Sequence, residues 1–81
     1  MSERVMRAKM EVQKVEQFAE SERVFMHCVA AKSYPADGSD EDNTFAKFSP
    51  SGSLELTIAN LFLRGKVQAG TKFYIDFTLA E

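Results

Sequence analysis

The stretch near the C-terminus, residues 72–79, constrains the fold more than any other part of the chain. Its apolar side chains, Phe73, Ile75, Phe77 and Leu79, occupy alternate positions, and the positions between them carry polar groups. Successive side chains of a β-strand point to opposite faces, so this pattern predicts a strand with one apolar and one polar face. We expect this strand to form a wall of the hydrophobic core.

The composition indicates an ordinary globular protein. Of the 81 residues, 44% are apolar and 27% are charged, which is not the composition of a disordered chain. A chain of this length forms a single domain, residues 1–81. A domain this small buries only about 60–65% of its unfolded surface, so association with further copies would add stability. We therefore expect a homo-oligomer.

Charge and cysteine usage exclude several classes. The net charge of −2 provides neither a basic surface for nucleic acid nor a polybasic membrane anchor. No apolar run approaches the roughly 18 residues that span a bilayer, and Met1–Arg4 is not followed by the apolar segment of a signal peptide. Cys28 has no second cysteine with which to form a disulfide. We expect a cytoplasmic protein without a membrane partner.

Two interpretations compete for residues 4–18. Met6, Ala8, Met10 and Val12 alternate with polar residues, which predicts an amphipathic strand. The alternative is a helix, in which a different apolar set would share one side: Val5, Ala8, Val12, Val15 and Phe18. The helix would leave Met6 and Met10 outside its apolar stripe, so we favour the strand.

Three more strands are expected before the last one, separated by turn residues: Arg23–Ala31, a short edge strand Thr44–Phe48, and Ser53–Asn60. The first of these should pair with residues 4–12 as an antiparallel hairpin. Together they predict an all-β or mainly β protein, a small antiparallel barrel or sandwich of about five strands, with a short helical turn near residues 60–65.

An acidic loop, residues 37–42, is the first candidate binding surface. Its carboxylates are Asp37, Asp40, Glu41 and Asp42. They do not follow the spacing of an EF-hand calcium loop, so a solvated loop is the interpretation we prefer to a metal site. The same charges would also suit contact with a basic partner.

The run Leu61-Phe62-Leu63, followed by Arg64, is the second candidate. Three consecutive apolar residues on a connection cannot all enter one core, because neighbours point in different directions. Either part of the run contacts another chain, with Phe62 as anchor and Arg64 at its polar rim, or Phe62 plugs the open end of a barrel.

No catalytic or metal-binding constellation is evident. His27 and Cys28 are adjacent, so on a strand they point to opposite faces and cannot act together as nucleophile and base. One His and one Cys fall short of the three or four ligands of a zinc site. We expect no enzyme activity and no cofactor.

Four segments carry a resemblance to a known family: Met6–Met10, Asp37–Pro50, Leu54–Asn60 and Phe73–Thr78. Over almost its whole length the chain resembles a family of small tailed-bacteriophage proteins, most of which have no assigned activity. The family has proline where this chain has Leu61 and Leu79. The resemblance implies a phage or prophage origin and expression in the bacterial cytoplasm, and it implies no catalytic residue.

These observations favour a non-enzymatic binding protein that engages a host protein or a small signalling ligand, as in host takeover or inhibition of host defence. One alternative is a single-stranded nucleic-acid-binding protein resembling an OB-fold. It would stack bases on Phe45, Phe48 and Tyr74, although the chain has no clustered basic stripe. A further alternative is a virion decoration or assembly protein.

Overall fold

The computed structural model describes residues 3–81. Met1 and Ser2 lie outside the described residues; they are the first two residues of Met1–Arg4, on which the expectation of no signal peptide rests. The described part of the chain is mainly β, as predicted. Its strands and its one 3-10 helix are, in chain order, β1 (Arg4–Gln17), β2 (Glu22–Cys28), β3 (Ser53–Ile58), η1 (Leu61–Leu63) and β4 (Lys72–Thr78). The helical alternative for residues 4–18 is wrong.

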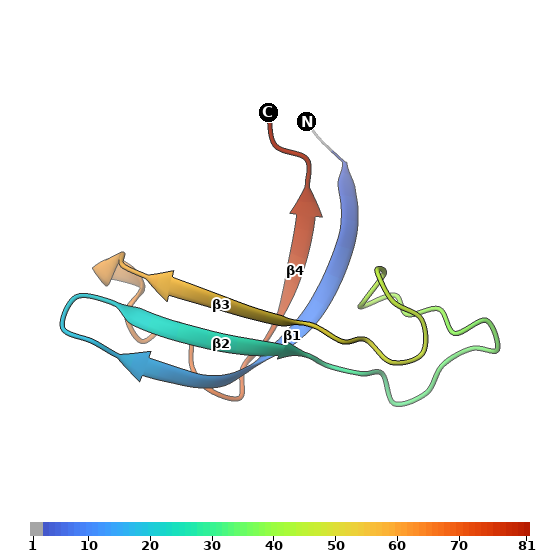
Figure 1. Ribbon diagram of the computed structural model, residues 1–81, viewed down its shortest axis with the longest axis horizontal. Helices are drawn as coiled ribbons and strands as arrows, with labels where there is room; N and C mark the ends of the chain where they lie inside the picture. Colours follow the sequence, from blue (N-terminus) through green and yellow to red (C-terminus); the bar gives the residue numbers. More distant parts are fainter. Residues whose placement is uncertain (1–2) are drawn as a thin grey trace.

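Within residues 3–81 the strands form a single antiparallel sheet with the order β3-β2-β1-β4. The long strand β1 serves both halves of the sheet, because its first part pairs with β4 and its last part pairs with β2. Figure 1 shows that β1 bends along its length, so that β4 stands steeply against β2 and β3. The sheet curls into a half-barrel that does not close.

An irregularity in β1 explains why its sequence also fits a helix. The register with β2 shifts between Val12 and Lys14, so Val12 lies opposite Met26 and Val15 lies opposite Val24. Such a bulge inserts one extra residue and changes the alternation of side chains beyond it. Val12 and Val15 therefore both face the core although three positions separate them.

The expected fifth strand, Thr44–Phe48, is absent: residues 44–48 are irregular, and among residues 3–81 there are four strands. Phe48 has a φ of 62°, a left-handed conformation that a strand does not contain. Ala46 N donates to Asn43 O, which forms a turn at this place. Strands β2 and β3 also end earlier than predicted, at Cys28 and Ile58.

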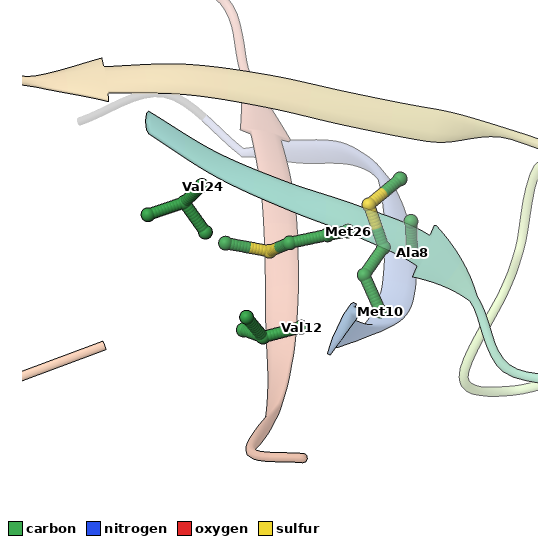
Figure 2. Packing of buried hydrophobic residues seen from close by; sticks show 5 residues of the cluster. All are labelled: Ala8, Met10, Val12, Val24 and Met26. Carbon is green, nitrogen blue, oxygen red and sulfur yellow. The ribbon is translucent and has the colours of Figure 1, made fainter. Parts of the chain in front are cut away.

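The core lies on β1 and β2 (Figure 2) and consists of small and medium apolar side chains: Ala8, Met10, Val12, Val24 and Met26. Strand β4 contributes less to the core than predicted. Phe73, Ile75 and Phe77 lie opposite Met10, Ala8 and Met6, on the expected face. However, β4 is an edge strand, so Phe77 stays 42% exposed, and Leu79 lies beyond the strand with 72% exposed.

Candidate functional site

The turn that follows β3 has a defined local structure. Asn60 precedes the 3-10 helix η1, and its side-chain Oδ1 accepts a hydrogen bond from Phe62 N at 3.0 Å. Arg64 N donates to Leu61 O at 3.2 Å and closes the turn. Asn is a preferred N-cap because its short side chain reaches the free N–H groups of the first turn. We call residues 61–64 the Phe62 turn; the predicted helical turn is confirmed.

Arg64 attaches the Phe62 turn to the β1–β2 hairpin. Its guanidinium donates to the side chain of Gln17 at 2.7 Å and to the backbone carbonyls of Phe18 and Ala19 at 3.0 and 3.2 Å. Arginine suits this role, because its planar group carries several N–H donors in a fixed geometry. Arg64, although exposed, therefore holds the turn in place; its position at the polar rim of an interface stays a prediction.

Glu22 provides a second attachment. Its side chain is almost fully buried and accepts from Gly65 N at 2.8 Å and from the side chain of Gln17 at 3.2 Å. A buried carboxylate is stable only when it is hydrogen-bonded. No sequence signal indicates this role, because Glu22 begins a strand at a place where solvent-facing charges are common.

The apolar side chains of the Phe62 turn face water. Phe62 is 90% exposed, Leu61 59% and Leu63 43%. Phe62 therefore does not plug the half-barrel, and that alternative is wrong. Its side chain projects from a turn that Asn60, Arg64 and Glu22 hold to the rest of the molecule.

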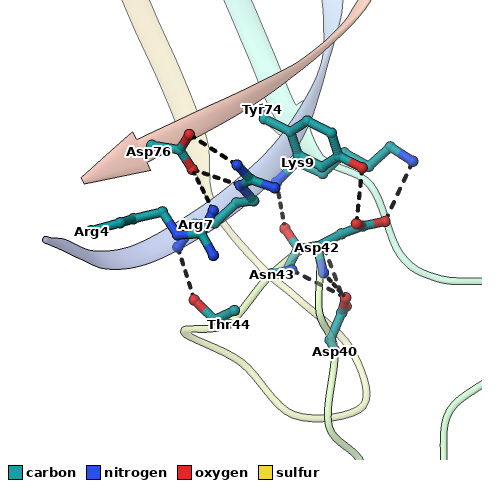
Figure 3. Close-up of polar contacts among 9 residues, drawn as sticks. All are labelled: Arg4, Arg7, Lys9, Asp40, Asp42, Asn43, Thr44, Tyr74 and Asp76. Atoms are coloured by element: carbon teal, nitrogen blue, oxygen red, sulfur yellow. Dashed lines mark hydrogen bonds and ion pairs between the residues drawn. The ribbon is translucent and has the colours of Figure 1, made fainter. Parts of the chain in front are cut away.

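The acidic loop is organised internally, around Asp40 and Asn43 (Figure 3). Asp40 accepts hydrogen bonds from the backbone N–H of Asp42 and of Asn43 and from the Asn43 side chain, at 3.0 to 3.2 Å. Asn43 is completely buried; its Oδ1 accepts from Lys9 N at 2.8 Å and its Nδ2 donates to Val29 O at 2.9 Å. Asn43 thus pairs with the edge of β1 beyond the end of β2.

The other carboxylates of the loop differ in their surroundings. Asp42 accepts from the Tyr74 hydroxyl at 3.0 Å and lies 3.5 Å from Lys9 Nζ. Asp37 accepts from Ser39 N at 3.0 Å, and this hydrogen bond lowers the pKa of the Asp37 carboxyl. Glu41 is exposed. Figure 1 shows this loop at the opposite end of the sheet from the Phe62 turn, so the two candidate surfaces do not form one site.

The face of β1 and β4 that points away from the core carries a polar network. Arg7 Nε and Nη2 donate to the two oxygens of Asp76 at 2.6 and 3.1 Å, and the guanidinium lies 4.4 Å from the centroid of the Tyr74 ring. The hydrogen bond from Arg7 lowers the pKa of Asp76, and Arg4 lies 3.5 Å from the same carboxylate. The nucleic-acid alternative would use four cations to contact phosphates: Arg7, Lys9, Lys47 and Lys72. Two of them, Arg7 and Lys9, are already paired with carboxylates.

His27 and Cys28 are neighbours on β2 and border a shallow hollow of about 410 Å³ with Pro50–Ser53. Burial raises the pKa of the Cys28 thiol, which disfavours the reactive thiolate. Among residues 3–81 no three His, Cys, Asp or Glu side chains form a group that could hold a metal ion.

Comparisons with protein-family models, with curated proteins and with solved structures found no match to this chain. No helix among the described residues is both long enough and apolar enough to cross a membrane. The candidate site therefore rests on the geometry of the chain itself. The best-defined candidate is the Phe62 turn, a fixed segment with an exposed aromatic side chain.

Proposed function

We propose that this chain is a small phage-encoded binding protein without enzyme activity, which acts in the host cytoplasm and engages a host protein through the Phe62 turn. Such a role would suit host takeover or inhibition of host defence. One observation carries the proposal: Phe62 is 90% exposed on a turn that is fixed by side-chain hydrogen bonds at both ends. The resemblance to small phage proteins supports the setting.

Energetics support a binding role for this turn. A small number of aromatic side chains contributes most of the free energy of many protein interfaces. Binding also costs less when a segment is held in its bound conformation beforehand, because fewer degrees of freedom are lost. Asn60 and Arg64 restrict the Phe62 turn in this way, so the turn would present its aromatic ring at low entropic cost.

A protein partner fits this shape better than a small signalling ligand. Small ligands bind in concave sites that cover most of their surface, whereas Phe62 projects into solvent. A projecting aromatic side chain is suited to insertion into a hollow on another protein.

The half-barrel is open at β3 and at β4. The closed barrel or sandwich expected from the sequence would therefore require strands from a second chain.

Affinity capture from cells infected with the phage that encodes the chain tests the proposal. Wild-type bait should retain a host protein, and Phe62→Asp bait should retain at least tenfold less, because replacing an aromatic hot-spot side chain by a charge costs more than about 1.4 kcal/mol, the free energy of a tenfold change. Leu79→Asp is the matched control, since Leu79 is also an exposed apolar residue but lies outside the turn. Circular dichroism of all three baits checks the fold.

Equal capture by wild-type and Phe62→Asp baits would contradict the proposal. Two other outcomes would replace it with the alternatives. Sub-micromolar binding of a single-stranded oligonucleotide that is lost with Phe48→Ala would indicate a nucleic-acid-binding protein. Detection of the chain in purified virions by mass spectrometry would indicate a decoration or assembly protein.

A further inference from the structure

Strand β4 has an open edge. Among the described residues, β1 is the one strand that pairs with β4, so backbone N–H and C=O groups on the other side of Lys72–Thr78 have no partner strand. An edge of this kind is a template for pairing with another chain, and monomeric proteins usually protect it with proline, charged side chains, a bulge or a covering loop. Strand β4 contains no proline and no bulge, since the irregularity in its pairing lies in β1, between Arg4 and Met6. Its charged residues are Lys72, at its first position, and Asp76, which Arg7 of the same chain binds.

The molecule exposes more surface than a compact monomer of its size. Its accessible surface is 6024 Å², whereas a folded monomer of 9.1 kDa exposes about 4,900 Å². The radius of gyration is 14.5 Å, compared with about 12 Å for a compact domain of 81 residues. The excess of about 1,100 Å² exceeds the roughly 800 Å² that each partner buries in a standard interface.

The side chains of β4 are complementary to those of a second β4 that runs antiparallel to it. With a two-fold axis at Ile75, the whole strand Lys72–Thr78 pairs with itself, and Phe73 lies opposite Phe77 of the second copy. Aromatic pairs of this kind stabilise antiparallel strands. The pairing would also cover Phe77, which is 42% exposed in the single chain.

Charges on the other face of β4 favour the same arrangement. Lys72 would lie diagonally opposite Asp76 of the second copy, within reach of a long side chain. Asp76 would also lie diagonally opposite Asp76 of the second copy, but each of these carboxylates already accepts a hydrogen bond from Arg7 of its own chain. The other open edge, β3, contains no cation that could make such a contact. If β3 paired with itself around Leu56, Glu55 would lie diagonally opposite Glu55 of the second copy, and like charges destabilise such a pair.

We propose that two copies of this chain associate through their β4 edges, antiparallel and with the two-fold axis at Ile75. The result is one continuous sheet with the order β3-β2-β1-β4-β4-β1-β2-β3. This interface is distinct from the Phe62 turn, so the proposal stands independently of the proposed function. The dimer would carry two Phe62 turns and could therefore engage a partner bivalently.

Cysteine cross-linking tests the pairing and its register. In a Cys28→Ser background, Ile75→Cys places two thiols at the two-fold axis, where opposite Cα atoms lie about 4.5–5.5 Å apart, within the range of a disulfide. Mild oxidation should convert most of this variant to a covalent dimer. Leu56→Cys on β3 is the matched control and should remain monomeric on a non-reducing gel. A dimer from Leu56→Cys alone, or one that needs a mixture of the two variants, would overturn the proposal.

A charge reversal provides a second test that leaves the core intact. Lys72→Glu replaces two attractive diagonal contacts by repulsive ones, so the dimer should dissociate about tenfold more readily in sedimentation equilibrium. Lys66→Glu makes the same change of charge at an exposed position outside β4 and should leave the association unchanged. Equal effects of the two substitutions, or a wild-type mass of 9.1 kDa at every concentration, would contradict the proposal.

Discussion

At the scale of single residues, Asn43 determines how the long connection between β2 and β3 attaches to the sheet. Its side chain replaces a neighbouring strand, because it bonds both Lys9 N and Val29 O. Asp40 in turn holds Asn43 through its backbone and its side chain. Asp40, from the acidic loop that we expected to be solvated, and Asn43, directly after this loop, are thus buried. Their spacing of three residues is common in loops, so the sequence does not reveal this role.

Replacing Asn43 by alanine should lower the free energy of unfolding by about 2–4 kcal/mol, because the part-buried groups Lys9 N and Val29 O would lose their partner and a buried side chain would be removed. Urea denaturation followed by circular dichroism measures this loss. Glu41→Ala, two positions earlier in the same loop and exposed, is the control and should change stability by less than about 0.5 kcal/mol. Similar losses for the two variants would show that Asn43 is not the attachment point.

Asp76 should make stability depend on pH in the acid range. The hydrogen bond from Arg7 lowers the pKa of Asp76 in the folded state, so the unfolded chain binds this proton more readily. The resulting stability is present above the unfolded pKa of about 3.9 and is lost as pH falls through the lower folded value. Asp76→Asn should therefore flatten the decline of the urea midpoint below pH 4. An unchanged decline would mean that the Arg7–Asp76 contact does not form in solution.

At the scale of elements, the alternation of apolar residues predicted the four strands of residues 3–81. It did not predict the features that depend on tertiary contacts. Alternating apolar residues predicted the β1–β2 hairpin and also which side chains of β4 share the core face. The strand at residues 44–48 did not form, because Asn43 and the left-handed Phe48 direct the chain into turns. The exposure of Phe77 could not be predicted, since it depends on the position of β4 at the edge of the sheet. For the Phe62 turn, the sequence identified the apolar run but not the attachments through Arg64 and Glu22.

The Phe62 turn should lose its rigidity when Arg64 is removed. Arg64→Ala deletes the hydrogen bonds to Gln17, Phe18 and Ala19, so the backbone order parameter of Phe62 should fall from a rigid value of about 0.85 towards 0.6. Nuclear magnetic resonance relaxation measures this change. Arg64→Lys should restore it only in part, since an ammonium group lacks the planar set of donors. Full rigidity in Arg64→Ala would show that the Asn60 cap alone fixes the turn.

At the scale of the whole molecule, the chain is extended rather than compact, with extents of 48, 32 and 15 Å along its principal axes. A chain with five buried apolar residues among those described has a small core of its own. Association through β4 would extend the sheet and cover apolar surface that the single chain leaves in water. Phe73 and Ile75 already pack against this core, so Phe77, which is 42% exposed in the single chain, is the apolar side chain of β4 that the association would chiefly cover.

Amide hydrogen exchange, measured above and below the concentration at which the dimer dissociates, tests this account most directly. The β4 amides that point away from β1 should exchange at least tenfold more slowly in the concentrated sample, because pairing protects backbone N–H groups from water. The outward amides of β3 should exchange fast at both concentrations. Equally fast exchange of the β4 amides at every concentration, or protection that appears on β3 instead, would contradict the account.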